Sequence, residues 1–196
     1  MIEHIYDPGN LWERYKKSFI IRIKSVDHKT LRNTWDSQTN RTTFYSNYVM
    51  RNVAADLEMK LEEQLLQIDY ALSVRTQDGT LVPVIFIESE NVARTSIHEI
   101  SKLCSVNTPL RVLVTVCEWD LSPEAWGTKS LQNTLLQGWR QIIENYRGVY
   151  SQNAIVGVLI GEWWDRESRL RFYSHTFDLS KSEERDESYV FETFVK

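Results

Sequence analysis

The sequence predicts an α/β fold in which helices flank a mixed central sheet that has extra strands near the C-terminal end. Two strand-like runs surround Asp78-Gly79, a dipeptide suited to the positive φ angles of a tight hairpin turn. A helical pattern follows the hairpin, and the apolar residues 110–117 follow that helix. A strand, a helix and a second strand form a right-handed crossover, so the strands on either side of this helix should be parallel.

Residues 46–117 form the expected core. A first helix is expected over roughly residues 46–66, because apolar side chains recur there at the three-and-four spacing of one helical stripe. The hairpin covers residues 68–91, and its second strand is apolar over residues 81–87, as is typical of a strand covered on both faces. A second helix is expected over residues 91–105.

The segments around this core are read from their composition. Residues 1–18 are expected to be irregular, residues 19–26 to form a strand, and residues 27–43 to form a loop or a partly ordered segment. Beyond the core, about residues 118–196 read as a C-terminal extension. A helix is expected there at about 129–146, strands at 154–161, 169–177 and 189–195, and a mobile charged stretch at 180–188. No internal repeat or shift of composition divides the chain, so one domain over residues 1–196 is expected.

The composition is that of an ordinary soluble protein, with 42% apolar and 26% charged residues. The formal charge of −4 argues against a protein coated with phosphate-binding charge, although it leaves room for a local basic face. Cys104 and Cys117 lie in apolar contexts without metal-ligand spacing, which favours reduced thiols and a cytoplasmic location. No signal peptide is evident and no apolar run is long enough to span a membrane, so no membrane association is expected.

Three carboxylates are expected to meet at one end of the hairpin. Glu88 and Glu90 come directly after the apolar strand and point to the same face, because side chains alternate along a strand. If Asp78 and Gly79 are the only loop residues, counting back along both strands places Asp69 opposite Glu88. Like charges at paired positions destabilise a sheet, and a divalent cation would reverse that effect. The convergence favours a metal site over the alternative, in which the carboxylates are merely solvated at strand ends.

The order of a helix, an acidic strand, a Glu-x-Glu strand, a helix and an apolar strand resembles the core of the PD-(D/E)xK nuclease superfamily, which has the restriction-endonuclease-like fold. The likeness covers about residues 46–117. Asp69 matches the superfamily's acidic residue and Glu88 its second one, whereas Glu90 stands where lysine is usual. The resemblance implies that a lysine from the following helix can take over that role, and Lys102 is placed to do so.

The resemblance further implies a Mg²⁺-dependent or Mn²⁺-dependent endonuclease-like hydrolase that cleaves phosphodiester bonds of DNA in defence or repair. The acidic residue often found on the superfamily's first helix would be matched by Glu58 or Glu62. The implied catalytic residues are Asp69, Glu88, Glu90 and Lys102, and the implied metal ligands are Asp69, Glu88, Glu90 and Glu62. A homodimer would let an enzyme of this kind cut both strands.

Two other hypotheses remain open. The chain could be a catalytically inactive member of the same fold that binds nucleic acid or protein, which the acidic net charge and the missing motif lysine favour. It could also be an unrelated α/β protein. Lys102 could equally be a solvated residue paired with Glu99 or His98, and Trp163 and Trp164 are more typical of packing than of base stacking.

Overall fold

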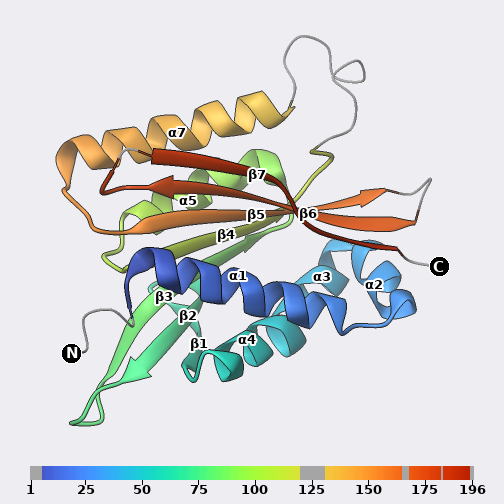
Figure 1. Ribbon diagram of the computed structural model, residues 1–196, viewed down its shortest axis with the longest axis horizontal. Coiled ribbons are helices and arrows are strands. Elements are labelled where there is room, and N and C mark those ends of the chain that lie inside the picture. The colour runs from blue at the N-terminus through green and yellow to red at the C-terminus, as the bar shows by residue number, and fades with distance from the viewer. Residues whose placement is uncertain (1–5, 120–130, 165–167, 182, 195–196) are drawn as a thin grey trace.

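A computed structural model describes residues 6–119, 131–164, 168–181 and 183–194. The seven strands of these residues form one mixed sheet in which their spatial order is the same as their order along the chain. Helices cover both faces of the sheet (Figure 1). The predicted α/β class, with a mixed sheet between helices, is therefore confirmed.

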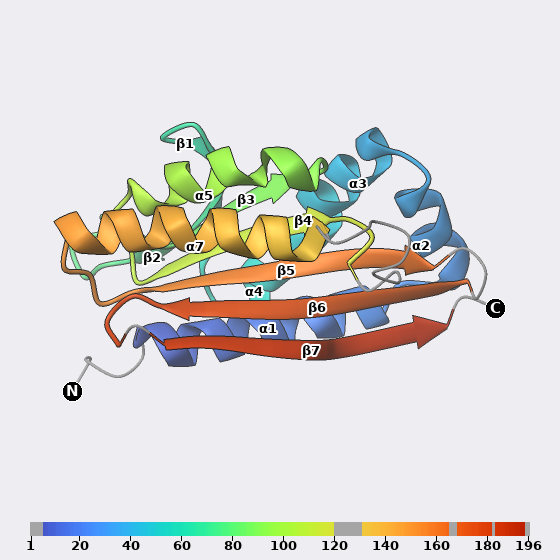
Figure 2. The ribbon, with the colours of Figure 1, turned by 90° about the horizontal axis from the view of Figure 1, so that it is seen from above.

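The strands are β1 (Lys60–Leu65), β2 (Ile68–Arg75), β3 (Leu81–Glu90), β4 (Leu110–Val116), β5 (Ile155–Trp164), β6 (Arg169–Asp178) and β7 (Glu183–Phe194). The central strands β3, β4 and β5 are parallel, as expected for β3 and β4 from the helix between them. On one side of them β2 is antiparallel to both β1 and β3, and on the other side β6 is antiparallel to both β5 and β7 (Figure 2).

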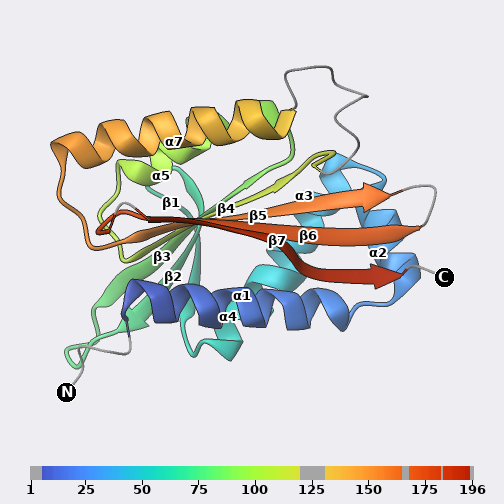
Figure 3. The same cartoon turned by 45° about the horizontal axis from the view of Figure 1, so that its top comes forward.

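The α-helices are α1 (Pro8–Lys24), α2 (His28–Trp35), α3 (Gln38–Phe44), α4 (Arg51–Asp56), α5 (Ser96–Cys104) and α7 (Leu131–Val149). A π-helical segment, Tyr45–Met50, joins α3 to α4. Helices α1 and α4 cover one face of the sheet, and α5 and α7 cover the other (Figure 3). The helices expected after the hairpin and in the C-terminal extension are thus present as α5 and α7. Residues 129–130 of the second prediction lie outside the described residues.

The N-terminal segment is helical, so the predictions of an irregular start, a strand and a loop over residues 1–43 are wrong where the structure describes them. Asp7 caps α1 by accepting a hydrogen bond from the Asn10 backbone N–H at 3.0 Å. Trp12, Tyr15 and Phe19 then recur at helical spacing and are buried against the sheet. This aromatic stripe is the signal of the helix, and it outweighs the β-branched run within residues 19–26.

The prediction of a helix over residues 46–66 is also wrong for the second half of that range. Helix α4 ends at Asp56, Glu58 adopts a φ of 58°, and β1 begins at Lys60. Leucines at positions 57, 61 and 65 continue the helical spacing, but pairing of β1 with β2 satisfies the backbone of this segment instead. Glu62 therefore lies on an edge strand and not on a helix.

The charged stretch at residues 180–188 is not wholly mobile, because β7 begins at Glu183 and pairs with β6 from Asp178 onwards. Residues 189–194 of the predicted late strand are the second half of the same element, and residue 195 lies outside the described residues. β7 is the outermost strand of the described sheet and pairs through its backbone with β6 alone.

Helix α1 lies very close to the sheet at Gly157 of β5. A Cβ atom at position 157 would lie 2.5 Å from Cζ3 of Trp12, which no real contact tolerates. The indole Nε1 of Trp12 donates a hydrogen bond to Thr176 Oγ1 at 2.8 Å, so the ring cannot move away without losing a buried partner.

We therefore expect Gly157→Ala to lower the free energy of unfolding by about 2–3 kcal/mol, because it overpacks a closed contact. Urea denaturation measures this loss. The matched control is Gly148→Ala in α7, where nothing lies within 4 Å of the added methyl group. That change should be neutral or stabilise by up to about 1 kcal/mol. Equal effects of the two substitutions would contradict the close packing of α1.

Candidate functional site

The β2–β3 hairpin has a longer loop than the sequence predicts. The backbone N–H of Thr76 donates to Thr80 O at 2.9 Å, and that of Gly79 donates to Thr76 O at 3.0 Å. Gly79 has a φ of 89°, a conformation that glycine adopts without strain. Three residues therefore form the loop, and the expected two-residue turn is wrong.

A β-bulge compensates for the longer loop. Leu72 pairs with Ile85, whereas Ser73 pairs with Pro83, so β3 contains one extra residue at this point. Proline has no N–H to donate to the ladder, which suits a bulge. Beyond the bulge the pairing is that of the predicted register, with Tyr70 opposite Ile87, so Asp69 and Glu88 are the next residues along the two strands.

Asp69 lies at the start of β2 and reaches the neighbouring strand. Its Oδ2 accepts a hydrogen bond from the Ser89 backbone N–H at 3.0 Å, and its Oδ1 accepts one from Gln64 Nε2 at 3.1 Å. The carboxylate is thus held against β3, one residue beyond Glu88 and close enough to influence its ionisation.

Glu88 is a buried carboxylate, only 2% exposed, on the side of the sheet that α5 covers. Lys102 reaches it from the last turn of α5. The Lys102 ammonium lies 2.6 Å from Glu88 Oε1 and 2.7 Å from Glu99 Oε2, and it donates a hydrogen bond to Gln67 O at 3.1 Å. Lys102 therefore extends to Glu88, as predicted, and also pairs with Glu99, which the sequence had suggested only as an alternative.

Burial and charge oppose each other at this cluster. Burial is the main cause that raises the pKa of Glu88 to about 8, and the carboxylates of Asp69 and Glu99 add to it, while the Lys102 ammonium lowers it. Burial lowers the pKa of Lys102, but its pairs with Glu88 and Glu99 outweigh that effect and raise it above its usual value. A carboxyl group that titrates near neutral pH can exchange protons during a reaction.

The other predicted carboxylates bind elsewhere. Glu90 Oε1 accepts a hydrogen bond from the Val92 backbone N–H at 2.7 Å, and Glu62 Oε2 accepts one from Ser73 Oγ at 2.5 Å. Within the described ranges, no group of three or more His, Cys, Asp or Glu side chains is arranged to hold a metal ion. Asp69 and Glu88 are therefore the pair that the structure brings together.

A second buried carboxylate, Glu162 on β5, was overlooked in the sequence and is 1% exposed. It accepts hydrogen bonds from the Trp119 backbone N–H at 2.7 Å, from Trp164 Nε1 at 2.6 Å and from the Tyr173 hydroxyl at 2.6 Å. The sequence signal that could have identified this buried carboxylate is a lone glutamate near the end of an apolar strand. Because these donors occupy the carboxylate, we interpret Glu162 as a packing centre for the aromatic residues around it.

A cavity of about 250 Å³ lies apart from the cluster, between the start of α1 and the end of β6. Polar groups at its wall have protein partners: Trp12 donates to Thr176, and Asp178 accepts hydrogen bonds from Ser180. The cluster of Asp69, Glu88 and Lys102 is therefore the stronger candidate for chemistry.

Comparison with known proteins adds no relative: no family model, no curated protein and no solved structure matches the chain. Of the helices in the described residues, none has the length and apolar character needed to cross a membrane.

Proposed function

We propose that this protein is a metal-dependent nuclease of the PD-(D/E)xK type that cleaves phosphodiester bonds of DNA. The observation that carries the proposal is the 2.6 Å approach of the Lys102 ammonium to Glu88, with Asp69 on the adjacent strand. These groups come from α5, β3 and β2. The elements α4, β2, β3, α5 and β4 occur in the order that the resemblance requires, with β1 added between the first two, and this supports a restriction-endonuclease-like fold.

Asp69 and Glu88 fit a site for Mg²⁺ or Mn²⁺. Mg²⁺ takes oxygen ligands and keeps several waters, so one or two carboxylates together with substrate phosphates suffice. Glu88 already lies against a cation, the Lys102 ammonium, despite its burial. When bound, the metal would supply Lewis acidity and a water of lowered pKa.

The side chains of the chain itself have distinct proposed roles. Lys102 can donate a hydrogen bond to a phosphate oxygen or orient a water molecule if its ammonium exchanges one of its three present acceptors, and 35% of its side chain is exposed to solvent. Glu99 holds Lys102 towards the site from the preceding turn of α5. Glu90 remains a predicted ligand or base that would first have to leave the Val92 N–H. A homodimer would present two such sites to the two strands of a duplex.

A catalytically inactive protein of the same fold is the second candidate. The position of Glu90 favours it, because the residue in the lysine position of the motif is acidic and caps a backbone N–H. In that case Glu88, Lys102 and Glu99 would form a structural ion-pair network, and the protein would act by binding.

Metal titration distinguishes the two candidates. We expect Mg²⁺ or Mn²⁺ to raise the melting temperature of the wild-type protein and to permit cleavage of plasmid DNA that EDTA abolishes. Glu88→Ala should remove the shift in melting temperature, and Glu144→Ala, at an exposed position on α7, should keep it. No shift and no cleavage with either metal would overturn the nuclease proposal in favour of the binding module.

A further inference from the structure

Positive charge is concentrated in one part of the chain. Residues 14–60 contain ten Lys and Arg against four Asp and Glu, a formal charge of +6. The complete chain has a charge of −4, so the remaining residues together have a charge of −10. Such asymmetry within one chain is typical of proteins with a polyanionic partner, whereas an even mixture of charges is typical of an ordinary solvated surface.

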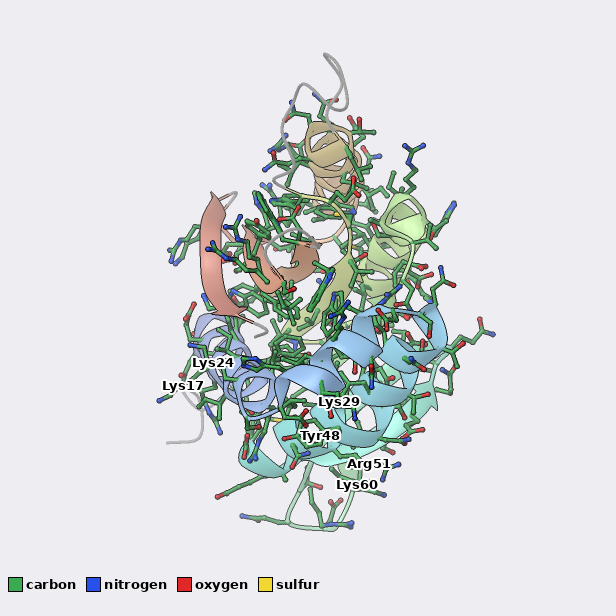
Figure 4. The ribbon with its side chains drawn as sticks, turned by 90° about the vertical axis from the view of Figure 1, so that its right-hand side faces the viewer. Lys17, Lys24, Lys29, Tyr48, Arg51 and Lys60 are labelled. Atoms are coloured by element: carbon green, nitrogen blue, oxygen red, sulfur yellow. The ribbon has the colours of Figure 1, made fainter. Side chains whose placement is uncertain are left out.

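The fold places five of these cations on one side of the protein. We name Lys17, Lys24, Lys29, Arg51 and Lys60 the basic face; they come from α1, α2, α4 and β1 (Figure 4). Figure 4 looks onto the end of the molecule towards which the parallel strands β3, β4 and β5 run. The candidate site involves residues near that end of β3, and ligands of open α/β sheets bind where the carboxyl ends of the strands lie.

Three lysines of the basic face retain charge that no acid of the described residues neutralises. Within the residues that the structure describes, Lys17, Lys29 and Lys60 form no ion pair, and all three are exposed. The neighbouring acid Asp27 is engaged in capping α2, where it accepts hydrogen bonds from the N–H and hydroxyl of Thr30. Repulsion between the cations is thus left for solvent ions or a partner to relieve.

Two further acids near the basic face are already paired. Asp56 binds the guanidinium of Arg22, and Glu63 lies 3.2 Å from Arg51. The second pair is exposed on both sides, so it contributes little to stability and can open at little cost. Arg51 can therefore exchange Glu63 for a phosphate group.

The surface between these cations is well ordered by contacts. Tyr48 lies among them in Figure 4, and its hydroxyl is 2.8 Å from Ser25 Oγ. Its ring stacks on Phe44 with a centroid distance of 5.6 Å. These contacts connect the end of α1 to the segment before α4, so the cations are presented on a preorganised surface.

We propose that the basic face binds the sugar–phosphate backbone of duplex DNA, independently of base sequence. Lysine ammonium groups bind phosphates as point charges and release condensed counterions when they do so. The choice of DNA rests on the proposed nuclease function, whereas the basic face itself does not depend on catalysis.

Binding is tested by fluorescence anisotropy with a labelled duplex of about 30 base pairs, in EDTA, between about 50 and 200 mM salt. The double variant Lys29→Gln, Lys60→Gln should bind roughly tenfold more weakly than the wild type, and the slope of log affinity against log salt should fall by about two. The control is Arg75→Gln, Lys181→Gln, which removes the same charge from exposed positions at the end of β2 and between β6 and β7. The control should change the affinity by less than about twofold.

Equal affinities of the two double variants, or no binding of DNA, would overturn this inference. The inference would also be overturned if the Lys29→Gln, Lys60→Gln protein lost binding to anionic phospholipid vesicles but bound DNA like the wild type. The partner of the basic face would then be a membrane surface. Binding that depends on Lys29 and Lys60 without cleavage after metal is added would support the inference while the nuclease proposal failed. If the Lys29→Gln, Lys60→Gln protein binds duplex DNA with wild-type affinity and also cleaves it, the result would support only the nuclease proposal.

Discussion

Asp69→Asn and Glu88→Gln are each expected to lower the rate of metal-dependent DNA cleavage by roughly a thousandfold. Both changes preserve the shape of the side chain and remove its charge. Asp69 and Glu88 are the two carboxylates that the structure brings together, so the loss of either leaves only one for a divalent cation. Initial rates on supercoiled plasmid, at saturating Mg²⁺ and Mn²⁺, measure the effect.

Two further variants make this result specific. Glu144→Gln, on the exposed side of α7, should cleave like the wild type. Glu90→Lys restores the residue usual in the superfamily and also removes the acceptor for the Val92 N–H. Impaired cleavage by Glu90→Lys would indicate a ligand or base role for Glu90. New activity in this variant alone would show that the wild-type site has decayed.

The outcome that would exclude the proposed site is cleavage at the wild-type rate by either Asp69→Asn or Glu88→Gln.

Lys102→Met is expected to lower the free energy of unfolding by about 2–3 kcal/mol above pH 8, because it leaves the buried Glu88 carboxylate without its cation. The expected loss is smaller than for a fully buried pair, since 35% of the Lys102 side chain is exposed. Methionine retains much of the apolar stem, so lost packing contributes little. Urea denaturation at about pH 5.5 and pH 9 measures the change.

The loss should depend on pH in a defined direction. The pKa of Glu88 is raised from its ordinary value of 4.5 to about 8 in the folded protein, and removing Lys102 raises it further. The folded state therefore holds the proton more tightly than the unfolded state, and stability falls as pH rises from about 4.5 through 8. Lys102→Met should cost less than about 1 kcal/mol at the lower pH, where Glu88 is protonated.

A double-mutant cycle identifies the pair responsible. Glu88→Gln combined with Lys102→Met should recover most of the stability lost in Lys102→Met at high pH, because no charge then remains buried and unpaired at position 88. Lys181→Met serves as the control, since Lys181 is exposed and lies 3.8 Å from Asp178, and it should change stability by less than about 0.5 kcal/mol. A loss that is the same at both pH values would contradict the coupling of Lys102 to Glu88.

The sequence alone identified the acidic hairpin and the helix that follows it. Asp78-Gly79 indicated a turn, side-chain alternation placed Glu88 on a defined face, and helical spacing placed Lys102 within reach. These are local properties, because turn chemistry and periodicity depend on residues close together in the chain. The parallel pairing of β3 with β4 followed from the handedness of crossovers, which is nearly invariant.

The register beyond the bulge, where Tyr70 pairs with Ile87, was predicted correctly from an incorrect loop. The real loop is one residue longer, and the bulge near Pro83 cancels the shift before the strands reach Asp69. The bulge depends on pairing across the hairpin, so the sequence of either strand alone does not specify it.

Tertiary structure also decided the state of segments with mixed signals. Residues 60–65 have helical leucine spacing but became an edge strand, because β2 offered backbone partners. Residues 19–24 resemble a strand locally but belong to α1, because Trp12, Tyr15 and Phe19 can all be buried together only on a helix packed against the sheet. The contact of Glu99 with Lys102 was likewise decided by the tertiary structure. Burial of Glu88 makes a cation shared between Glu88 and Glu99 favourable, and burial is a property of the completed fold.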